Sequence, residues 1–331
     1  MFRRAMLSLV LLPLVAVAAR AADNANNPAY DNPLAAAADP DFALQGEYVG
    51  ELDTGLGAVK TGARVIALGK GKFHAVLYLG GLPGDGWNKE VYEGDGELKN
   101  GAVLFEQPQG LGRIENGTLS MTTPEGDVVG KLSRTERKSP TLGQKPPEGA
   151  VVLFDGRNAD ALVNGRVSDD GLLIPPATSK QKFGDCSLHV EFRTPFMPLA
   201  RGQGRGNSGC YLQGRYEVQI LDSFALAGKN NECGGIYSVK DCDANLCYPP
   251  LVWQTYDIDY TAAEFDGAGK KQKNARITVR HNGVVIHDNV ELPHATTAAP
   301  VAEGAEKGPL YLQDHGNPVR FRNIWLLETS K

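Results

Sequence analysis

The chain has 331 residues, of which 42% are hydrophobic and 22% are charged, and its formal net charge is −5. This length suits one large or two ordinary domains, and the composition is too apolar for a disordered chain. A pI near 5.7 argues against a nucleic-acid-binding protein. The 39 Gly and 20 Pro residues are typical of many turns between short strands, so we expect a β-rich protein.

The N-terminus has the pattern of a signal peptide. Arg3 and Arg4 precede an apolar run, and Ala19-Arg20-Ala21 supplies the small residues of a cleavage site. The run is too short for a membrane anchor, and no later segment reaches that length. We therefore expect a signal peptide over residues 1–21 and an exported protein, periplasmic or extracellular. Residues 22–40, rich in Ala, Asn, Pro and Asp, are predicted to be a flexible leader.

Two β-rich blocks follow, and a linker joins them. Residues 41–137 contain short apolar runs with turn signals between them, which predicts a small antiparallel β domain. Residues 138–149 are rich in Pro, Gly and charge and are predicted to be the linker. The strand pattern resumes over residues 150–329, where Asn282-Gly283 predicts a two-residue hairpin turn. No long stretch has a helical period, so we predict an all-β chain.

The five cysteines are interpreted in the light of export. Cys233, Cys242 and Cys247 fall within fifteen residues, and Cys186 and Cys210 lie in strand-like runs. An oxidising compartment favours a disulfide, with Cys233–Cys247 as the predicted pair. A zinc site is the alternative, but the cluster has no CxxC motif and no His.

Polar side chains recur on one face of several predicted strands. In SLHVEFRT, RYEVQIL, LYLQDHG and VRFRNIW, polar and apolar residues alternate with the period of a strand. The polar positions carry Glu, Gln, His and Arg rather than the Lys, Thr and Ser of a solvated sheet. These groups suit acid–base chemistry and hydrogen bonding to a polyhydroxylated ligand, so we predict a concave binding face. Its members are Glu191, Arg193, Glu217, Gln219, Gln313, His315 and Arg320.

One spacing suggests a glycosidase. Glu217-Val-Gln219-Ile-Leu-Asp222 resembles the E-x-D-x-x-E strand of laminarinase-type retaining glycosidases. Retention requires two carboxyl groups about 5–5.5 Å apart. Here Gln219 replaces the middle acid, and Asp222 faces the same side only if a bulge intervenes. A direct retaining hydrolase that uses Glu217 and Asp222 is therefore one alternative.

Five motifs of the second block resemble a known family. They are VLFDGRN (152–158), GNSGCYLQGRYEVQILDSF (206–224), CGGIYSVKD (233–241), VWQTYDIDY (252–260) and GPLYLQDHGNPVRFRNIWL (308–326). In this order they are similar to the 3-keto-disaccharide hydrolase domain, also described as 3-keto-α-glucoside 1,2-lyase or 3-keto-2-hydroxy-glucal hydratase. The resemblance covers roughly residues 148–329 and implies a concanavalin/laminarinase-like β-sandwich, a jelly roll.

The resemblance also implies a chemistry. A ketone at C3 of a sugar acidifies the C2 hydrogen, so a general base can remove it. The enolate then expels the C1 substituent by β-elimination, and water re-hydrates the glucal, which gives net hydrolysis of a 3-keto-glycoside. Glu217 or His315 would act as base and acid.

The other roles follow from the same reaction. Arg193 or Arg320 would polarise the ketone. A divalent cation could replace the arginine, with Glu217, Asp222 or His315 as ligands. The rival to an enzyme is a secreted carbohydrate-binding module that uses the same face without turnover. The expected substrate-binding residues are Glu191, Gln219, Gln313 and Asp222.

Overall fold

The computed structural model describes residues 28–55 and 57–329. The predicted signal peptide and the first residues of the predicted leader lie outside the described residues. The described part is nearly all β, as the sequence predicted, with helix limited to α2 (Pro33–Ala36) and the 3-10 turn η1 (Gly202–Gly204). No helix in these two ranges is long and apolar enough to cross a membrane.

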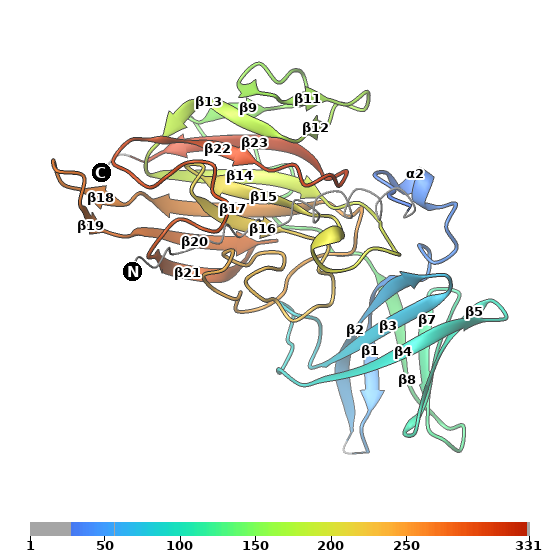
Figure 1. The fold of residues 1–331 in the computed structure, drawn as a ribbon. Coiled ribbons are helices and arrows are strands. Elements are labelled where there is room, and N and C mark those ends of the chain that lie inside the picture. The colour runs from blue at the N-terminus through green and yellow to red at the C-terminus, as the bar shows by residue number, and fades with distance from the viewer. Residues whose placement is uncertain (1–27, 56, 330–331) are drawn as a thin grey trace, which may run out of the picture.

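The first block folds into a closed antiparallel barrel of eight strands, in which β8 pairs with β1 (Figure 1). The sequence predicted short apolar strands in this block. Two of the eight strands lack such a pattern: β4 is charged and mostly exposed, and β6 has only one buried residue. The strands are β1 (Gly46–Asp53), β2 (Ala58–Gly69), β3 (Lys72–Leu79), β4 (Val91–Lys99), β5 (Ala102–Gln107), β6 (Gly110–Glu115), β7 (Thr118–Thr122) and β8 (Val128–Thr135).

The second block forms two larger antiparallel sheets and a small ribbon of β18 (Glu264–Phe265) and β19 (Lys271–Lys273). The five-stranded sheet has the order β10 (Leu162–Val163), β13 (Ala177–Phe183), β22 (Gly308–Leu312), β15 (Ser208–Leu212) and β16 (Tyr216–Ile220). The eight-stranded sheet has the order β11 (Arg166–Val167), β12 (Leu173–Ile174), β23 (Arg320–Glu328), β14 (Cys186–Arg193), β17 (Gln254–Thr261), β20 (Ala275–His281) and β21 (Val284–Leu292), with β9 (Val151–Phe154) beside β23.

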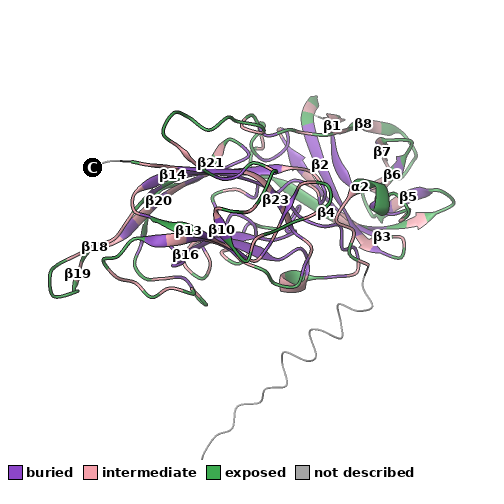
Figure 2. Cartoon of the chain, turned by 90° about the horizontal axis from the view of Figure 1, so that it is seen from above, coloured by how far each residue is buried: buried purple, intermediate pink, exposed green. Residues whose placement is uncertain are grey.

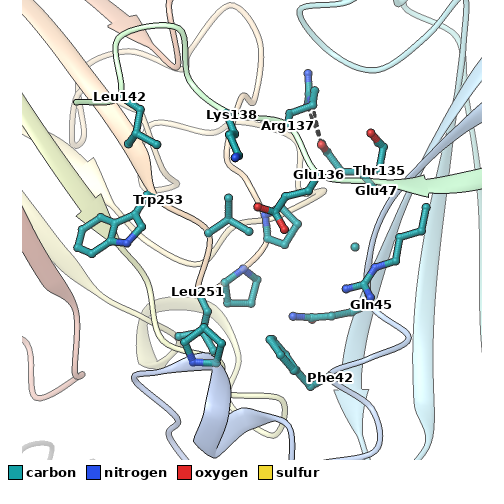
Figure 3. Close-up of a pocket in the computed structure, with 16 residues that line it drawn as sticks. Phe42, Gln45, Glu47, Thr135, Glu136, Arg137, Lys138, Leu142, Leu251 and Trp253 are labelled. Atoms are coloured by element: carbon teal, nitrogen blue, oxygen red, sulfur yellow. Dashed lines mark hydrogen bonds and ion pairs between the residues drawn. The ribbon is translucent and has the colours of Figure 1, made fainter. Parts of the chain in front are cut away.

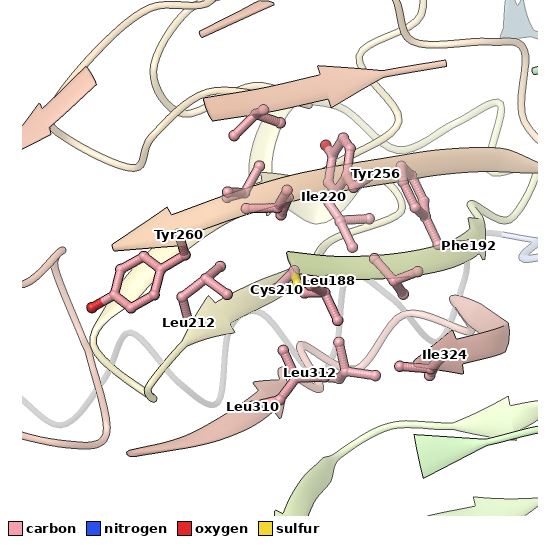
Figure 4. Packing of buried hydrophobic residues seen from close by; sticks show 14 of the residues in the cluster. Leu188, Phe192, Cys210, Leu212, Ile220, Tyr256, Tyr260, Leu310, Leu312 and Ile324 are labelled. Atoms are coloured by element: carbon pink, nitrogen blue, oxygen red, sulfur yellow. The ribbon is translucent and has the colours of Figure 1, made fainter. Parts of the chain in front are cut away.

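These two sheets share one hydrophobic core. Alternate residues of β14 point inward from the eight-stranded sheet, and alternate residues of β15, β16 and β22 point inward from the five-stranded sheet (Figure 4). Burial is nearly complete along the central strands, and the exposed residues concentrate at turns and at the β18–β19 ribbon (Figure 2). Polar residues on these strands must therefore lie on the outer faces of the two sheets.

The predicted hairpin at Asn282-Gly283 is confirmed. Both residues have positive φ, 50° and 79°, which a type I′ turn requires and which Asn and Gly tolerate. A bulge then shifts the register, so that His287 lies opposite Val279.

The barrel packs directly on the second block. Arg64 of β2 is fully buried between them, where its Nε pairs with Glu47 Oε1 at 3.0 Å and its Nη1 donates to the Asn245 carbonyl at 2.9 Å. Beside it, an apolar cluster joins Ile66 and Leu82 of the barrel to Phe224 of the second block. The two parts are therefore held together by buried contacts as well as by the chain.

The leader and the linker are anchored where the structure describes them. Tyr30 forms a bridge to Phe196, with N···O distances of 3.0 and 2.9 Å, so this part of the leader is not the free segment that its composition suggested. In the linker, Ser139 Oγ lies 2.6 Å from Thr255 Oγ1, on the eight-stranded sheet. Both segments therefore cover part of the second block.

The predicted Cys233–Cys247 disulfide is not formed, and this prediction was wrong. All five cysteines are free and buried. Cys247 Sγ donates to the carbonyls of Tyr248 (3.5 Å) and Leu221 (3.6 Å), and Cys233 Sγ lies 3.2 Å from the Tyr256 hydroxyl. The thiols thus act as small core residues whose S–H groups find partners inside the protein.

Candidate functional site

The hairpin of β15 and β16 brings Tyr211 and Glu217 together. The register pairs Tyr211 with Glu217 and Gly209 with Gln219, while Cys210 on the same hairpin points into the core. Because side chains alternate along a strand, Tyr211, Glu217 and Gln219 lie on the outer face of the five-stranded sheet.

Glu217 is a buried carboxyl group with a single hydrogen-bond donor among the described residues. Its side chain is 3% exposed, and the Tyr211 hydroxyl donates to its Oε2 at 2.7 Å. Burial raises the pKa of Glu217 to about 7, although the hydrogen bond from Tyr211 opposes that rise. Oε1 accepts no hydrogen bond from any residue of the described part. Glu217 therefore exchanges a proton near neutral pH and has one oxygen free to do so.

The position of this oxygen depends on a glycine. A Cβ atom at Gly209, across the hairpin, would lie 2.2 Å from Glu217 Oε1. Any side chain there would displace the carboxyl group, so Gly209 is required by close approach rather than by its φ angle.

Polar side chains surround this carboxyl group. Gln313 Nε2 donates to the Tyr211 hydroxyl at 3.3 Å, and Gln219 Nε2 donates to Gln203 Oε1 at 3.0 Å. The ring of Tyr311 lies 5.4 Å from that of Tyr211, and Tyr311, Gln313 and Gln203 are half-buried. We call this set the Glu217 cluster: Gln203, Tyr211, Glu217, Gln219, Tyr311 and Gln313.

His315 and Asp222, two other predicted site residues, have different surroundings. His315 is exposed in the loop after β22 and bonds to no residue in the described ranges. That loop is tied to the Gln203 loop, because Asn317 Oδ1 accepts a hydrogen bond from the Asn207 N–H at 2.8 Å. Asp222 is buried in an ion pair with Arg205, with Oδ2 2.6 Å from Nε, so its charge is already compensated.

The residues present do not fit the metal site that the sequence suggested. Within residues 28–55 and 57–329, no three His, Cys, Asp or Glu side chains come together as a set of ligands. Glu217 is bound to a phenol and Asp222 to a guanidinium, so Glu217, Asp222 and His315 do not form one.

The structure does not bring Glu191, Arg193 and Arg320 to the Glu217 cluster. They lie on β14 and β23, where the register pairs Arg193 with Arg320, on the outer face of the eight-stranded sheet. The shared core separates this face from the five-stranded sheet. Polar and apolar residues alternate in the same way along the strands of both sheets. The sequence pattern therefore could not show that the two polar faces lie on different sides of the molecule.

The carboxylate of Glu191 has several hydrogen-bond donors around it, whereas that of Glu217 has one. It accepts hydrogen bonds from Arg322 Nε (2.7 Å), Asn323 Nδ2 (2.8 Å) and the Gly143 N–H (2.5 Å). Burial opposes its ionisation, but these donors and His189 outweigh burial and lower the pKa of Glu191 to about 2. Because Gly143 belongs to the linker, Glu191 fixes the linker across the sheet.

Arg193 and Arg320, on the same face as Glu191, also have bonding partners within the protein. Arg193 Nη2 donates to the Asp31 carbonyl at 2.6 Å, and Arg320 Nη2 pairs with the Asp31 carboxylate at 2.5 Å. The Arg193 guanidinium also lies 5.0 Å from the ring of Trp253, whose face Arg322 covers at 4.0 Å. The two contacts with Asp31 hold the leader against the second block.

A large cleft lies between the barrel and the second block (Figure 3). Its volume is about 700 Å³, and no member of the Glu217 cluster lines it. Gln45 and Glu136 point into it from the barrel side, opposite Leu251 and Trp253 of the second block. The cleft is therefore separate from the candidate acid–base group.

Sequence reasoning missed Tyr211 and Gln203. The signal for Tyr211 was present in GCYLQGRYEV, because a three-residue turn after Leu212 pairs Tyr211 with Glu217. Gln203 gave no comparable signal, since it belongs to an irregular loop that folding brings to Gln219.

Comparison with known proteins finds one matching family model and similar solved structures. Residues 149–327, more than half of the chain, match the model of the 3-keto-alpha-glucoside-1,2-lyase-like domain. A Parabacteroides distasonis crystal structure described as a "putative glycosyl hydrolase" is 34% identical, with a TM-score of 0.50, over 55% of this chain and 85% of its own. A second structure from that organism, under the same description, is 16% identical, with a TM-score of 0.41, over 55% of this chain and 95% of its own. No curated protein matches the chain.

Proposed function

The chain belongs to the 3-keto-alpha-glucoside-1,2-lyase-like domain family, and from this premise we propose that it cleaves 3-keto-glycosides by elimination and re-hydration. The observation that carries the proposal is Glu217, a buried carboxyl group with a pKa near 7 and one free oxygen. It lies within the stretch that matches the family model. A group with these properties can both accept and return a proton at neutral pH.

In the proposed reaction, Glu217 Oε1 removes the C2 proton of the 3-keto sugar. The C2–H electron pair forms the enolate, which then expels the C1 oxygen as the C1–O bond breaks. Protonated Glu217 returns its proton to the departing oxygen, so one residue serves as base and then as acid. Water next adds across the double bond of the 2-hydroxy-glucal to give the free 3-keto sugar.

Neighbouring residues would orient the substrate. Tyr211 holds Oε2, which would leave Oε1 as the oxygen that meets the substrate. Burial raises the pKa of Tyr311, so its hydroxyl stays protonated and can donate to the enolate oxygen together with the Gln313 amide. Gln219 would bind sugar hydroxyls. Arg193 and Arg320 are left out of this role because they lie on the other sheet.

We also propose that the two sheets form a concanavalin/laminarinase-like β-sandwich and that the protein is exported. The single core between the five-stranded and eight-stranded sheets supports the first proposal. The basic start and apolar run of the N-terminus support the second. Export would place the enzyme where glycosides arrive from outside the cell.

The test compares a 3-keto-glucoside with its unoxidised parent, each incubated with the purified mature protein in heavy water, with and without EDTA. NMR follows the C2 proton. We expect cleavage of the keto compound alone, entry of deuterium at C2, and no effect of EDTA. Loss of cleavage with EDTA would contradict the metal-free mechanism. Cleavage of the parent would favour the retaining hydrolase that uses Glu217 and Asp222.

Two variants separate chemistry from binding. Glu217→Gln should abolish deuterium exchange, whereas Glu125→Gln makes the same chemical change at an exposed residue between β7 and β8 and should leave turnover intact. If the protein binds both sugars but turns over neither, it is a carbohydrate-binding module and the proposed enzyme activity is refuted.

A further inference from the structure

The interior of the barrel is filled in one half and hollow in the other. Tyr48, Phe73, Ile114 and Leu132 are among the buried residues of the filled half. Their cluster continues into Phe196 of the second block, so this half is closed by packing against the rest of the protein. Side chains normally fill the interior of an eight-stranded barrel, or the barrel holds one small ligand.

The other half contains a cavity of about 530 Å³. Phe105 and Leu119 are buried and separate it from the filled half. Ala75 and Leu79 of the lining are buried as well, whereas Tyr92 is 61% exposed. Five further apolar side chains of the lining are half-buried and therefore in contact with water: Leu52, Leu77, Leu111, Met121 and Val129.

Glycines account for the hollow. Gly94 of β4 and Gly110 and Gly112 of β6 line the cavity and contribute no side chain to fill it. A Cβ atom at Gly112 would lie 3.3 Å from Phe105 Cβ, and one at Gly94 would lie 2.8 Å from Gln107 Nε2, so side chains at these two positions would extend among the residues that line the cavity. The sequence thus keeps this half of the barrel open while the other half is packed.

The chemistry of the lining points to one class of ligand. The walls are mainly aliphatic, and burying such surface drives binding. The lining has no cation, and its polar side chains are the Tyr92 phenol, the Gln107 and Gln109 amides and the Thr122 hydroxyl. The Glu93 carboxylate points away from the cavity, because Glu93 lies opposite Val76 and its Oε2 is 3.5 Å from His74 Nε2 on the outer face of the barrel. An uncharged rim of amide and hydroxyl groups offers no countercharge to a carboxylate and can exchange hydrogen bonds with hydroxyl groups.

We propose that the barrel binds one aliphatic chain with an uncharged, hydroxyl-bearing head group, with the chain in the cavity and the head at the rim. This site is separate from the Glu217 cluster, and it does not depend on the proposed reaction. It gives the barrel a binding function of its own.

Adjacent residues of β8 provide a matched test. Val129 lines the cavity, whereas Val128 is 60% exposed and does not. The full chain is titrated with the neutral fluorophore N-phenyl-1-naphthylamine, which is then displaced with decyl glucoside or with decanoate. We expect saturable binding at one site per chain, and stronger displacement by decyl glucoside than by decanoate.

Val129→Arg should weaken fluorophore binding at least tenfold, and Val128→Arg should not change it. Met121→Trp fills the same cavity without adding charge and should also weaken binding, and circular dichroism verifies that each variant is folded. Absence of saturable binding, or equal effects of the two Val variants, would overturn the proposal. Stronger displacement by decanoate would overturn the assignment of the head group.

Discussion

Replacing Glu217 with Gln should stabilise the protein, by an amount that grows as pH rises from 4.5 to about 7. Gln keeps the size of the side chain and still accepts the hydrogen bond from Tyr211. It removes a carboxyl group whose pKa burial raises from 4.5 to about 7. At about 1.4 kcal/mol per pKa unit, ionising this group in the folded protein costs about 3 kcal/mol more than in the unfolded chain.

The sign follows from proton binding. Between pH 4.5 and about 7, folded Glu217 holds more protons than unfolded Glu217, so its contribution to stability falls as pH rises through this window. Below pH 4.5 both states are protonated, and the wild type and the Glu217→Gln variant should respond alike to pH. Above pH 7 the variant should gain the full difference, about 3 kcal/mol.

Urea unfolding at pH 4.5, 6 and 8 measures this difference. Subtracting the wild-type free energy of unfolding from that of the variant cancels every other titrating group. Glu125→Gln serves as the control, because this residue is exposed and has no hydrogen-bond or ion-pair partner among the described residues. A flat difference for Glu217→Gln, or a variant that is less stable at pH 8, would refute the argument from burial.

Four further outcomes are expected. Tyr211→Phe removes the hydrogen bond that favours the Glu217 carboxylate, so the acidic limb of kcat/KM against pH should move up by about one pH unit. Asp222→Asn leaves Arg205 buried without its partner and should cost about 3–5 kcal/mol in urea unfolding, unless Arg205 is also replaced. Glu191→Gln should lower stability above pH 4.5, with the difference vanishing as pH falls toward 2, and should speed proteolysis within the linker. Titration of the denatured, unreduced protein with a thiol reagent should find five thiols. A count of three would mean that one disulfide is present after all.

Local patterns in the sequence predicted a nearly all-β chain and the Asn282-Gly283 turn. They did not predict which strands share a sheet, because that depends on contacts between distant segments. β22 lies between β13 and β15, and no period in the sequence indicates this order. Polar positions on β14 and β16 therefore looked like one face, although they belong to different sheets. The cysteine spacing was equally ambiguous, because buried free thiols and a disulfide have the same sequence pattern.

Glu191 and Glu217 show why burial alone does not identify an acid–base group. Both are nearly inaccessible, yet the pKa of Glu191 falls to about 2 and that of Glu217 rises to about 7. Glu191 has a guanidinium, an imidazole, an amide and a backbone N–H around it, so its charge is fixed and holds the linker. Glu217 has one phenol, so its proton remains exchangeable at neutral pH. The number and charge of the donors around each carboxylate thus separate a structural anchor from the candidate catalytic group.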